Sequence, residues 1–343
     1  MVDSDPKRLV RNLTGEIPVN AKRICAGRNS RVFRVDCESG RTLLAKFYLQ
    51  PTADGHSRLE QEWTALQFIN ESGLRNIPRP LGFDETVQGT VYSFIHGTPE
   101  KKATDENIRA ILAFLAKLKD FSTQDNAAVL PRAAEACFSP AELVENIKLR
   151  FDKLRKLPAQ DELYQLMHSF LVNEFTPRFK KSIIKAEQKF PGCLWTKPLQ
   201  QHYKTLSPSD FGFHNMIKSD TSFTFVDFEY FGWDDPVKST SDFLLHPAMN
   251  LSESQMVLFF SGMENIFKND KQFIVRFKTY LPLFRLKWCM ILLNEFLNQH
   301  LQRREFAAGD ISDRNDLRAD QLDKAENFLN KDQKILTALN LRN

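Results

Sequence analysis

Cysteine is scarce in this 343-residue chain, and no pair of cysteines has a spacing that suggests a shared role. The five are scattered and odd in number, and none forms a Cys-x-x-Cys pair: Cys25, Cys37, Cys137, Cys193 and Cys289. The sequence therefore supports neither a disulfide framework nor a zinc site. The first residues carry no apolar signal region. A cytoplasmic, reducing location is expected.

Long apolar runs and dense basic runs are also missing. The most apolar stretch, 281–297, contains Arg285, Lys287 and Glu295, so it would be a poor membrane span. The net charge is only +4, and no run of lysine and arginine has interleaved aromatic residues. We therefore expect no nucleic-acid partner. No internal repeat and no low-complexity segment occurs.

What is present is typical of a folded globular protein, with 42% apolar and 26% charged residues. A chain of this length is expected to form two lobes. Strand patterns dominate residues 1–96, and helical periodicity dominates residues 97–343. Helical patterns continue through about 130–200, which we interpret as an insertion. Within it, Ser139-Pro140 marks a helix start, and a further helix is expected to end before Pro177.

A turn near residue 27 separates two expected strands of the N-terminal lobe. The segment Ile24–Val35 is interpreted as strand, tight turn and strand. Gly27, Asn29 and Ser30 in or beside this turn would let backbone amides face a phosphate without a crowding side chain. A plain hairpin is the alternative, because a single glycine is a weak signal.

Lys46 lies in an otherwise apolar strand predicted over Thr42–Tyr48. An unpaired charge would be costly to bury there, so a buried Lys46 needs an acidic partner. A helix is predicted over Arg58–Ser72, and Glu62 within it could supply that partner. The alternative is a solvated lysine at a sheet edge.

The stretch 206–236 carries the densest set of polar residues suited to chemistry. Asp210 is followed five residues later by Asn215, and a predicted hairpin leads from there to Asp227. If the hairpin forms, these three side chains come together at one edge of a sheet. Carboxylate and amide oxygens bind magnesium, and a carboxylate can accept a proton. The alternative is that they are ordinary turn residues.

This pattern resembles the aminoglycoside phosphotransferase and choline kinase-like superfamily, which is related to protein kinases. The resemblance rests on Asp210-x-x-x-x-Asn215, the following strand, and Asp227-Phe228-Glu229. It implies a bilobal α+β protein-kinase-like fold, with a small β-rich N-lobe and a large, mainly helical C-lobe. It also implies that Asp210 is the catalytic base and that Asn215 and Asp227 bind metal. Pro208-Ser209 replaces the usual His-Gly before the base.

Further segments resemble the same superfamily in the same order. They are the helix containing Glu62, the segment 77–84, and the strand 91–97 that would enter the hinge between the lobes. The resemblance implies that Lys46 contacts nucleotide phosphates while Glu62 positions it. It also implies that Ser93 and Ile95 offer main-chain groups to the adenine ring of ATP or GTP.

The expected function is transfer of the γ-phosphate of ATP, with Mg²⁺, to a hydroxyl of a small molecule such as an amino sugar, an amino alcohol or a sugar-like compound. One alternative is a catalytically weak, nucleotide-binding pseudokinase with a regulatory or scaffold role. Another is a protein acceptor, which the absence of an Ala-Pro-Glu segment after Asp227 disfavours. The sequence specifies neither the acceptor nor the oligomeric state.

The segment after Asp227 and the late helices are expected to line the acceptor site. Carboxylates with aromatic faces suit a cationic amine or a sugar. The candidates are Glu229, Tyr230, Trp233, Asp234, Asp235 and Trp288. The alternative is that Asp234 and Asp235 only shape the turn before Pro236 and that Trp288 belongs to the core. Asp242 is expected to stabilise the catalytic lobe from behind.

Overall fold

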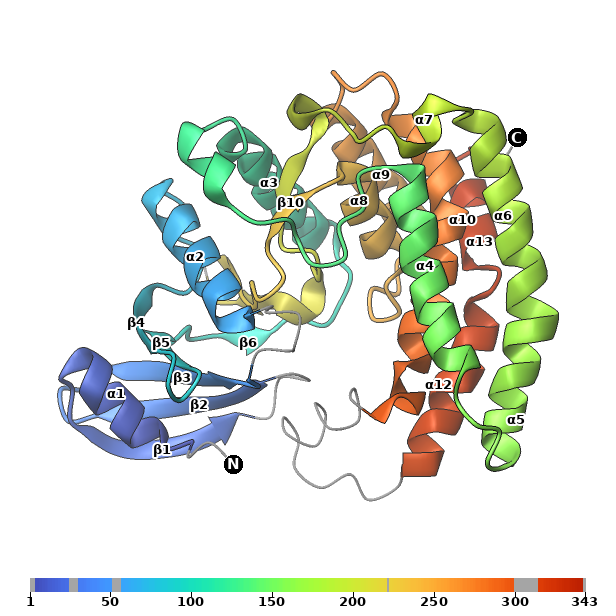
Figure 1. Ribbon diagram of the computed structural model, residues 1–343. Helices are drawn as coiled ribbons and strands as arrows, with labels where there is room; N and C mark the ends of the chain where they lie inside the picture. Colours follow the sequence, from blue (N-terminus) through green and yellow to red (C-terminus); the bar gives the residue numbers. More distant parts are fainter. Residues whose placement is uncertain (1–3, 25–29, 51–56, 221, 299–313, 342–343) are drawn as a thin grey trace.

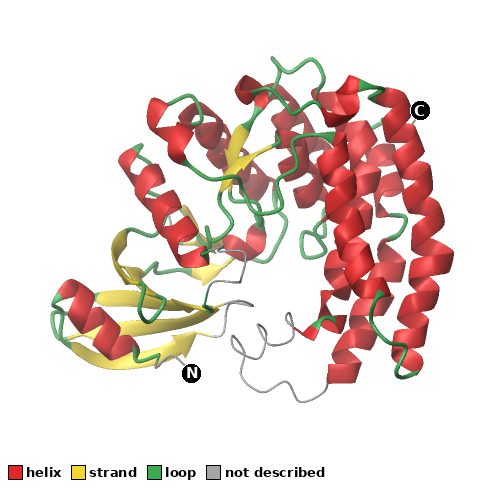
Figure 2. Ribbon diagram, in the orientation of Figure 1, coloured by secondary structure: helices red, strands yellow, loops and turns green. Residues whose placement is uncertain are grey.

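The computed structural model describes residues 4–24, 30–50, 57–220, 222–298 and 314–341. Figure 1 shows a small region built on a β-sheet beside a larger region made mostly of helices, and Figure 2 shows the same division by secondary structure. The predicted α+β architecture with two unequal lobes is confirmed. Among the described helices, none has both the length and the apolarity needed to cross a bilayer.

The N-terminal lobe is a five-stranded antiparallel sheet, in the order β1-β2-β3-β5-β4, with two helices. Its elements are α1 (Pro6–Thr14), β1 (Pro18–Ile24), β2 (Ser30–Cys37), β3 (Thr42–Tyr48), α2 (Arg58–Glu71), β4 (Pro80–Asp84) and β5 (Gly89–Ser93). Side chains alternate across β3. Leu43, Ala45 and Phe47 pack in one small core with α1, so Lys46 and Tyr48 face the opposite side, where Glu62 of α2 contacts both.

Helix α1 was not predicted, although its sequence carries clear boundary signals. Asp5 caps it by accepting hydrogen bonds from the amides of Lys7 and Arg8, and Pro6 occupies the first turn. Gly15 ends it in the left-handed conformation, with φ at 72°. Its buried residues Leu9 and Val10 cover the sheet and complete the small core.

The C-terminal lobe contains the remaining elements. They are β6 (Thr98–Pro99), α3 (Asp105–Phe121), η1 (Asp125–Val129), α4 (Pro140–Arg155), α5 (Glu162–Ser169), η2 (Phe170–Phe175), α6 (Thr176–Lys189), α7 (Cys193–Thr196), η3 (Gln201–Tyr203), β7 (Thr205–Ser207), η4 (Phe213–Asn215), β8 (Met216–Lys218), β9 (Phe223–Phe225), β10 (Gly232–Asp234), α8 (Pro236–Leu245), α9 (Glu253–Ile266), α10 (Phe273–Leu292), η5 (Leu293–Phe296), α12 (Arg314–Phe328) and α13 (Lys331–Ala338). Residues 130–200 are largely helical, as expected; that they form an insertion stays a prediction.

Helix α2 links the two lobes. By sequence it lies within the first 96 residues, yet its buried Ala65, Leu66, Phe68 and Ile69 belong to the large core that continues through the helices of the C-terminal lobe. The sheet and α1 have a separate core. A lobe boundary at residue 96 therefore stays a prediction, because packing assigns α2 to both sides.

The predicted helix stop at Pro177 is wrong. Helix α5 continues through the π-helical turn η2 into α6, and Pro177 lies in the first turn of α6. Proline removes one helical donor, and the wider turn compensates: the amide of Thr176 and its hydroxyl both donate to the carbonyl of Leu171. The predicted start at Ser139 is confirmed, because its side chain accepts from the amide of Glu142.

The hairpin predicted after Asn215 is confirmed. Strands β8 and β9 pair antiparallel, with Met216 opposite Phe225 and Lys218 opposite Phe223. Strand β6 joins β8 on its other side, and β7 pairs separately with β10. This arrangement carries the two loops that contain Asp210 and Asp227.

Buried ion pairs hold the helices behind these loops. The ammonium group of Lys238 lies 3.1 Å from Asp234 and 3.0 Å from Asp242. The second carboxylate oxygen of Asp242 accepts a hydrogen bond from the indole of Trp288 at 2.9 Å. Asp242 therefore has the structural role expected for it.

We predict that Lys238→Met destabilises the fold strongly. The side chain of Lys238 is 2% exposed, and its loss leaves the buried Asp234 and the partly buried Asp242 without their shared cation. Removing one partner of a buried pair costs about 3–5 kcal/mol in the free energy of unfolding. Urea unfolding of wild type and variant measures this loss of unfolding free energy. Lys153→Met, at an exposed position on α4, should change stability by less than about 0.5 kcal/mol; equal effects of the two substitutions would contradict the prediction.

Candidate active site

Lys46 is the centre of a buried ion-pair cluster that joins the two lobes. Its ammonium nitrogen lies 2.6 Å from Glu62 of α2 and 2.7 Å from Asp227 of the loop after β9. The carboxylate of Glu229 is 3.8 Å away. Lys46 is 5% exposed, so it is not a solvated edge lysine. The predicted contact between Lys46 and Glu62 is confirmed.

The cluster shifts the pKa values of its members. Burial opposes the charge of Lys46, but Asp227, Glu62 and Glu229 outweigh burial and raise its pKa well above the ordinary lysine value. Burial, together with the neighbouring Asp227 carboxylate, raises the pKa of Glu229 to about 7. Lys46 is therefore a permanent cation at neutral pH.

Three hydrogen bonds fix Glu62 in this position. The hydroxyl of Tyr48 donates to one carboxylate oxygen at 2.5 Å, and Lys46 donates to the same oxygen. The other oxygen accepts from the amide of Phe228 at 3.2 Å. Because Phe228 follows Asp227 directly, Glu62 ties α2 to the loop that carries Asp227.

The loops of Asp210 and Asp227 contact each other through Asn215. The amide of Val226, one residue before Asp227, donates to the carbonyl of Asn215 at 3.0 Å. The side-chain amide of Asn215 donates to the carbonyl of Asp210 at 3.0 Å. The three predicted residues thus lie on adjoining turns, as the hairpin required.

Both loops contain a residue with unusual backbone geometry. Ser209 has φ at 66° and Asp227 has φ at 69°, in the left-handed region that non-glycine residues seldom occupy. Such conformations persist where the surrounding structure enforces them, and they are concentrated at functional sites. Here the contacts of Lys46 and the bonds of the β8–β9 hairpin hold Asp227 in place.

The loop before Asp210 has its own support, although the usual His-Gly is absent. The hydroxyl of Ser209 accepts a hydrogen bond from Lys238 at 2.9 Å and donates to the carbonyl of Ala134 at 2.8 Å. The amide of Ser209 donates to the hydroxyl of Ser207. These contacts hold the left-handed turn that a glycine would otherwise adopt freely.

Two histidines that the sequence analysis missed lie beside Asp210. The Nε2 atoms of His214 and His246 are 3.1 Å and 3.9 Å from Asp210 Oδ1, and the two rings stack at a centroid distance of 4.6 Å. Nδ1 of His246 accepts from the amide of Ala248, so a neutral His246 carries its proton on Nε2, which faces Asp210. Burial, and then the charge of His214, lower the pKa of His246 to about 4 despite Asp210.

The prediction that Asp234 and Asp235 line the acceptor site is wrong. Both side chains are buried, at 0% and 2% exposure. Asp234 pairs with Lys238, and Asp235 caps α8 and pairs with Arg276 at 2.9 Å. They shape and anchor the turn before Pro236, which was the stated alternative, and they are not available to an acceptor.

The other residues predicted to line the acceptor site have different surroundings. Trp233 is 8% exposed, and its indole donates to the carbonyl of Ala127, so it belongs to the core. Glu229 is buried beside Lys46 and Arg58 instead of facing an acceptor. Arg58, which the sequence analysis missed, lies over the ring of Tyr230 at 5.5 Å. Trp288 packs edge-on against His246, near Asp210.

The structure describes only some of the residues that were predicted to contact the nucleotide. Gly27 and Asn29 lie outside the described residues, whereas Ser30 begins β2 opposite Tyr48. The amide of Ser93 already donates to the carbonyl of Arg79, so it is not free for an adenine ring. Ile95 follows β5 in the connection between the lobes, and its backbone has no hydrogen bond to another described residue.

The overall fold is that of protein-kinase-like phosphotransferases. A spectinomycin phosphotransferase solved with ADP and spectinomycin has a TM-score of 0.57 at 14% identity, covering 92% of this chain and 97% of that chain. An ADP-bound aminoglycoside phosphotransferase has a TM-score of 0.59 at 12% identity, covering 97% and 99%. A choline kinase from Cryptosporidium parvum has a TM-score of 0.54 at 13% identity, covering 94% and 92%.

The sequence also matches the profile of the phosphotransferase enzyme family over residues 20–238, which is more than half of the chain. The chain therefore belongs to the phosphotransferase enzyme family. Together with the fold, this confirms the resemblance to the aminoglycoside phosphotransferase and choline kinase-like superfamily, whose members are small-molecule phosphotransferases with hydroxyl acceptors. No curated protein sequence matches the chain.

We predict that Lys46→Met destabilises the protein more at alkaline than at acidic pH. Without the cation, Glu62, Asp227 and Glu229 are left as neighbouring carboxylates, at a cost of about 3–5 kcal/mol at pH about 8. The ordinary pKa of a glutamate is 4.5, and a carboxyl whose folded pKa is raised destabilises the fold progressively as the pH rises from its unfolded pKa to its folded pKa. The loss should therefore shrink at pH about 5.5, where Glu229, with a pKa of about 7, is protonated.

Urea unfolding at both pH values measures this difference. Lys22→Met, at an exposed position on β1, is the control and should have little effect at either pH. A loss in Lys46→Met that does not change with pH would contradict the electrostatic origin.

Proposed function

We propose that this phosphotransferase moves the γ-phosphate of ATP, bound with Mg²⁺, to a hydroxyl of a small molecule. The contact of Lys46 with Glu62 and Asp227 supports this most directly. It places a desolvated, permanently charged ammonium beside two carboxylates at the junction of the lobes. Phosphoryl transfer depends mainly on positioning and on charge stabilisation, and this cluster supplies both.

Lys46 is proposed to bind the nucleotide phosphates. Glu62 and Asp227 both accept hydrogen bonds from its ammonium group and keep it charged. Ser30, Gly27 and Asn29 are proposed to contribute near the phosphates and the main chain of Ile95 near the adenine ring. ADP in two of the similar structures supports a nucleotide as phosphate donor.

The residues beside Lys46 fit a magnesium ion. Asp227 and Glu229 supply carboxylate oxygens, which, with those of Glu62, lie within 4.8 Å of one another. The side-chain nitrogen of Asn215 donates to Asp210, which leaves its oxygen as the atom suited to a cation. Hard oxygen ligands of this kind suit Mg²⁺. When bound, the ion would neutralise charge on the phosphates. We propose Asn215 and Asp227 as its ligands.

Asp210 is proposed as the catalytic base. Its side chain is 45% exposed, so an acceptor hydroxyl can reach it, whereas Glu62 and Glu229 are buried. As the hydroxyl oxygen forms its bond to the γ-phosphorus, the bond between that phosphorus and the bridging oxygen breaks and ADP leaves, while the hydroxyl proton passes to a carboxylate oxygen of Asp210. His214 and His246 contact Oδ1 and are proposed as positioning residues that orient the carboxylate.

We propose that the acceptor is a hydroxyl compound and that its recognition does not require a cationic amine. Because Asp234 and Asp235 are buried, their carboxylates cannot bind the amine of an acceptor. The stacked rings of His214 and His246, with Trp288 edge-on to His246, instead offer flat faces near Asp210. Such faces suit a sugar ring or a polyol chain. Amino sugars remain acceptors of this class when a ring hydroxyl reaches Asp210.

We predict that Asp210→Asn loses turnover by about 10²–10⁴-fold with nearly unchanged affinity for the nucleotide, because the base acts on the acceptor. An ATP-consumption screen of sugars, polyols, amino sugars and amino alcohols identifies an acceptor, and calorimetry measures nucleotide affinity. Asp220→Asn is a matched control, an exposed carboxylate in the turn between β8 and β9. Wild-type turnover in Asp210→Asn would remove it from the role of base.

We predict that ATP raises the melting temperature of the protein only when Mg²⁺ is present, and that Asp227→Asn abolishes this rise. The substitution removes a proposed metal ligand while keeping the shape of the side chain. Thermal unfolding with ATP and with GTP, each with Mg²⁺ or EDTA, measures the effect and shows which nucleotide binds. Full Mg²⁺-dependent stabilisation of Asp227→Asn would disprove the metal assignment.

A further inference from the structure

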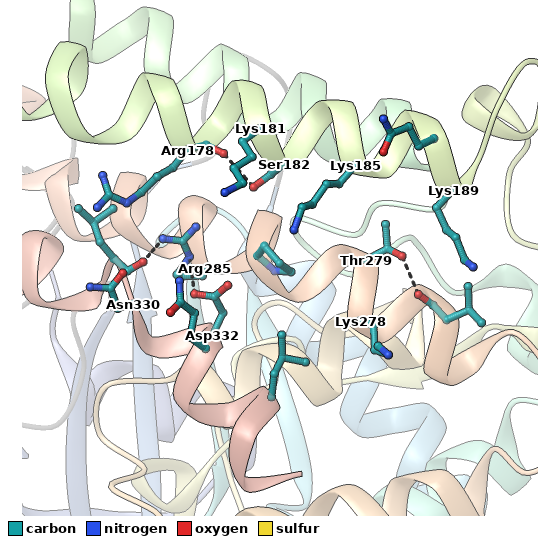
Figure 3. Close-up of a pocket in the computed structure, with 16 residues that line it drawn as sticks. Arg178, Lys181, Ser182, Lys185, Lys189, Lys278, Thr279, Arg285, Asn330 and Asp332 are labelled. Atoms are coloured by element: carbon teal, nitrogen blue, oxygen red, sulfur yellow. Dashed lines mark hydrogen bonds and ion pairs between the residues drawn. The ribbon is translucent and has the colours of Figure 1, made fainter. Parts of the chain in front are cut away.

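A cavity of about 960 Å³ lies between α6, α10 and α13, on helices well away from the β-sheet (Figures 1 and 3). It belongs to the C-terminal lobe and shares no lining residue with the cluster around Lys46 or with the surroundings of Asp210. Cavities of roughly 300–1,000 Å³ are the size that small-molecule ligands occupy in proteins.

The cavity is lined predominantly by positive charge. Among the described residues that line it are six cationic side chains and a single carboxylate, Asp332. The cations are Arg178, Lys181, Lys185, Lys189, Lys278 and Arg285. Four of them follow α6 at intervals of three or four residues, which places them on one face of the helix. Figure 3 shows this face directed toward α10.

The single carboxylate is already committed. Asp332 Oδ1 lies 2.9 Å from Nε of Arg285, and Nη1 of the same arginine donates to the carbonyl of Leu329. Asp332 therefore pairs directly with Arg285, and among the described residues it forms no direct ion pair with the lysines of α6 that line the cavity. Arg178 has its own partner, Glu174 of the preceding turn η2, at 2.7 Å.

The lysines of the cavity have no such partner. Within the part of the chain that the structure describes, none of Lys181, Lys185, Lys189 and Lys278 lies within 4.0 Å of a carboxylate. Like charges at these helical spacings repel each other, and Lys278 adds a further positive charge from the facing helix. A lysine stripe directed only at bulk water is ordinary, but this one lines a cavity to which the facing helix adds Lys278.

We propose that this cavity binds a small polyanion that carries two or more phosphate or carboxylate groups. Several lysines that converge from two helices match the separate charges of such a ligand, and charge-assisted hydrogen bonds to anions are among the strong ones in proteins. Ser182, Thr279, Asn330 and Gln333 add polar atoms to the lining. The site lies outside the proposed active site and does not depend on the proposed function.

The test uses inorganic triphosphate as the probe, titrated calorimetrically into the full-length protein in EDTA and at moderate salt. Wild type is compared with Lys181→Gln/Lys185→Gln, which removes two exposed charges from the cavity. The control Lys153→Gln/Lys180→Gln removes two exposed lysines of α4 and α6 that do not line it. It matches the net charge of the first variant. Thermal unfolding without the probe verifies that both variants fold.

We expect the cavity variant to bind triphosphate at least about tenfold more weakly than wild type, and the control to bind as wild type does. Equal binding by both variants would place the triphosphate elsewhere, such as at Lys46, and would overturn the proposal. Absence of binding in wild type would overturn it as well. Polarisation with a labelled single-stranded oligonucleotide is run in parallel. Lysine-dependent binding of the oligonucleotide without binding of triphosphate would make the surface one for nucleic acid and would also refute the proposal.

Discussion

The active-site region depends on keeping one desolvated charge, the ammonium group of Lys46, in contact with carboxylates from both lobes. An isolated buried lysine would lose its proton, whereas Glu62 and Asp227 keep this one charged. The contact exists only if β3, α2 and the loop after β9 are in place together. The same interaction that suits phosphate binding therefore also joins the lobes, which explains why the packing of α2 serves both.

A second set of buried charges supports the loop that carries Asp210 from behind. Lys238 reaches Asp234, Asp242 and the hydroxyl of Ser209, one residue before Asp210. Helix α10 contributes to this support: Arg276 binds Asp235, and Trp288 binds Asp242. Two charged residues that make 281–297 a poor membrane span also have partners inside the protein, because Arg285 pairs with Asp332 and Lys287 pairs with Glu135. Asp234 and Asp235, which follow Asp227 by seven and eight residues, belong to this support.

Patterns of short range in the sequence predicted much of this structure correctly. The β8–β9 hairpin, the extent of α2 and the cap at Ser139 follow from turn residues, periodicity and capping, which act within a few residues. The pairing of Lys46 was predicted for a related reason. A charge in an apolar strand requires a partner, and Glu62 lies in the helix that follows this strand. Helix α1 had equally local signals at Asp5, Pro6 and Gly15.

The sequence alone determined which residue types are candidates for the chemistry and the order in which short elements bring them near one another. Only the tertiary structure decided which acids stay accessible. Asp210 and Asp234 are both acidic loop residues in sequence, yet one is 45% exposed and the other is enclosed with Lys238. The tertiary structure also places His246, which is 36 residues further along the chain, beside Asp210. Burial and pairing depend on contacts between segments far apart in the chain, and no local pattern encodes those contacts.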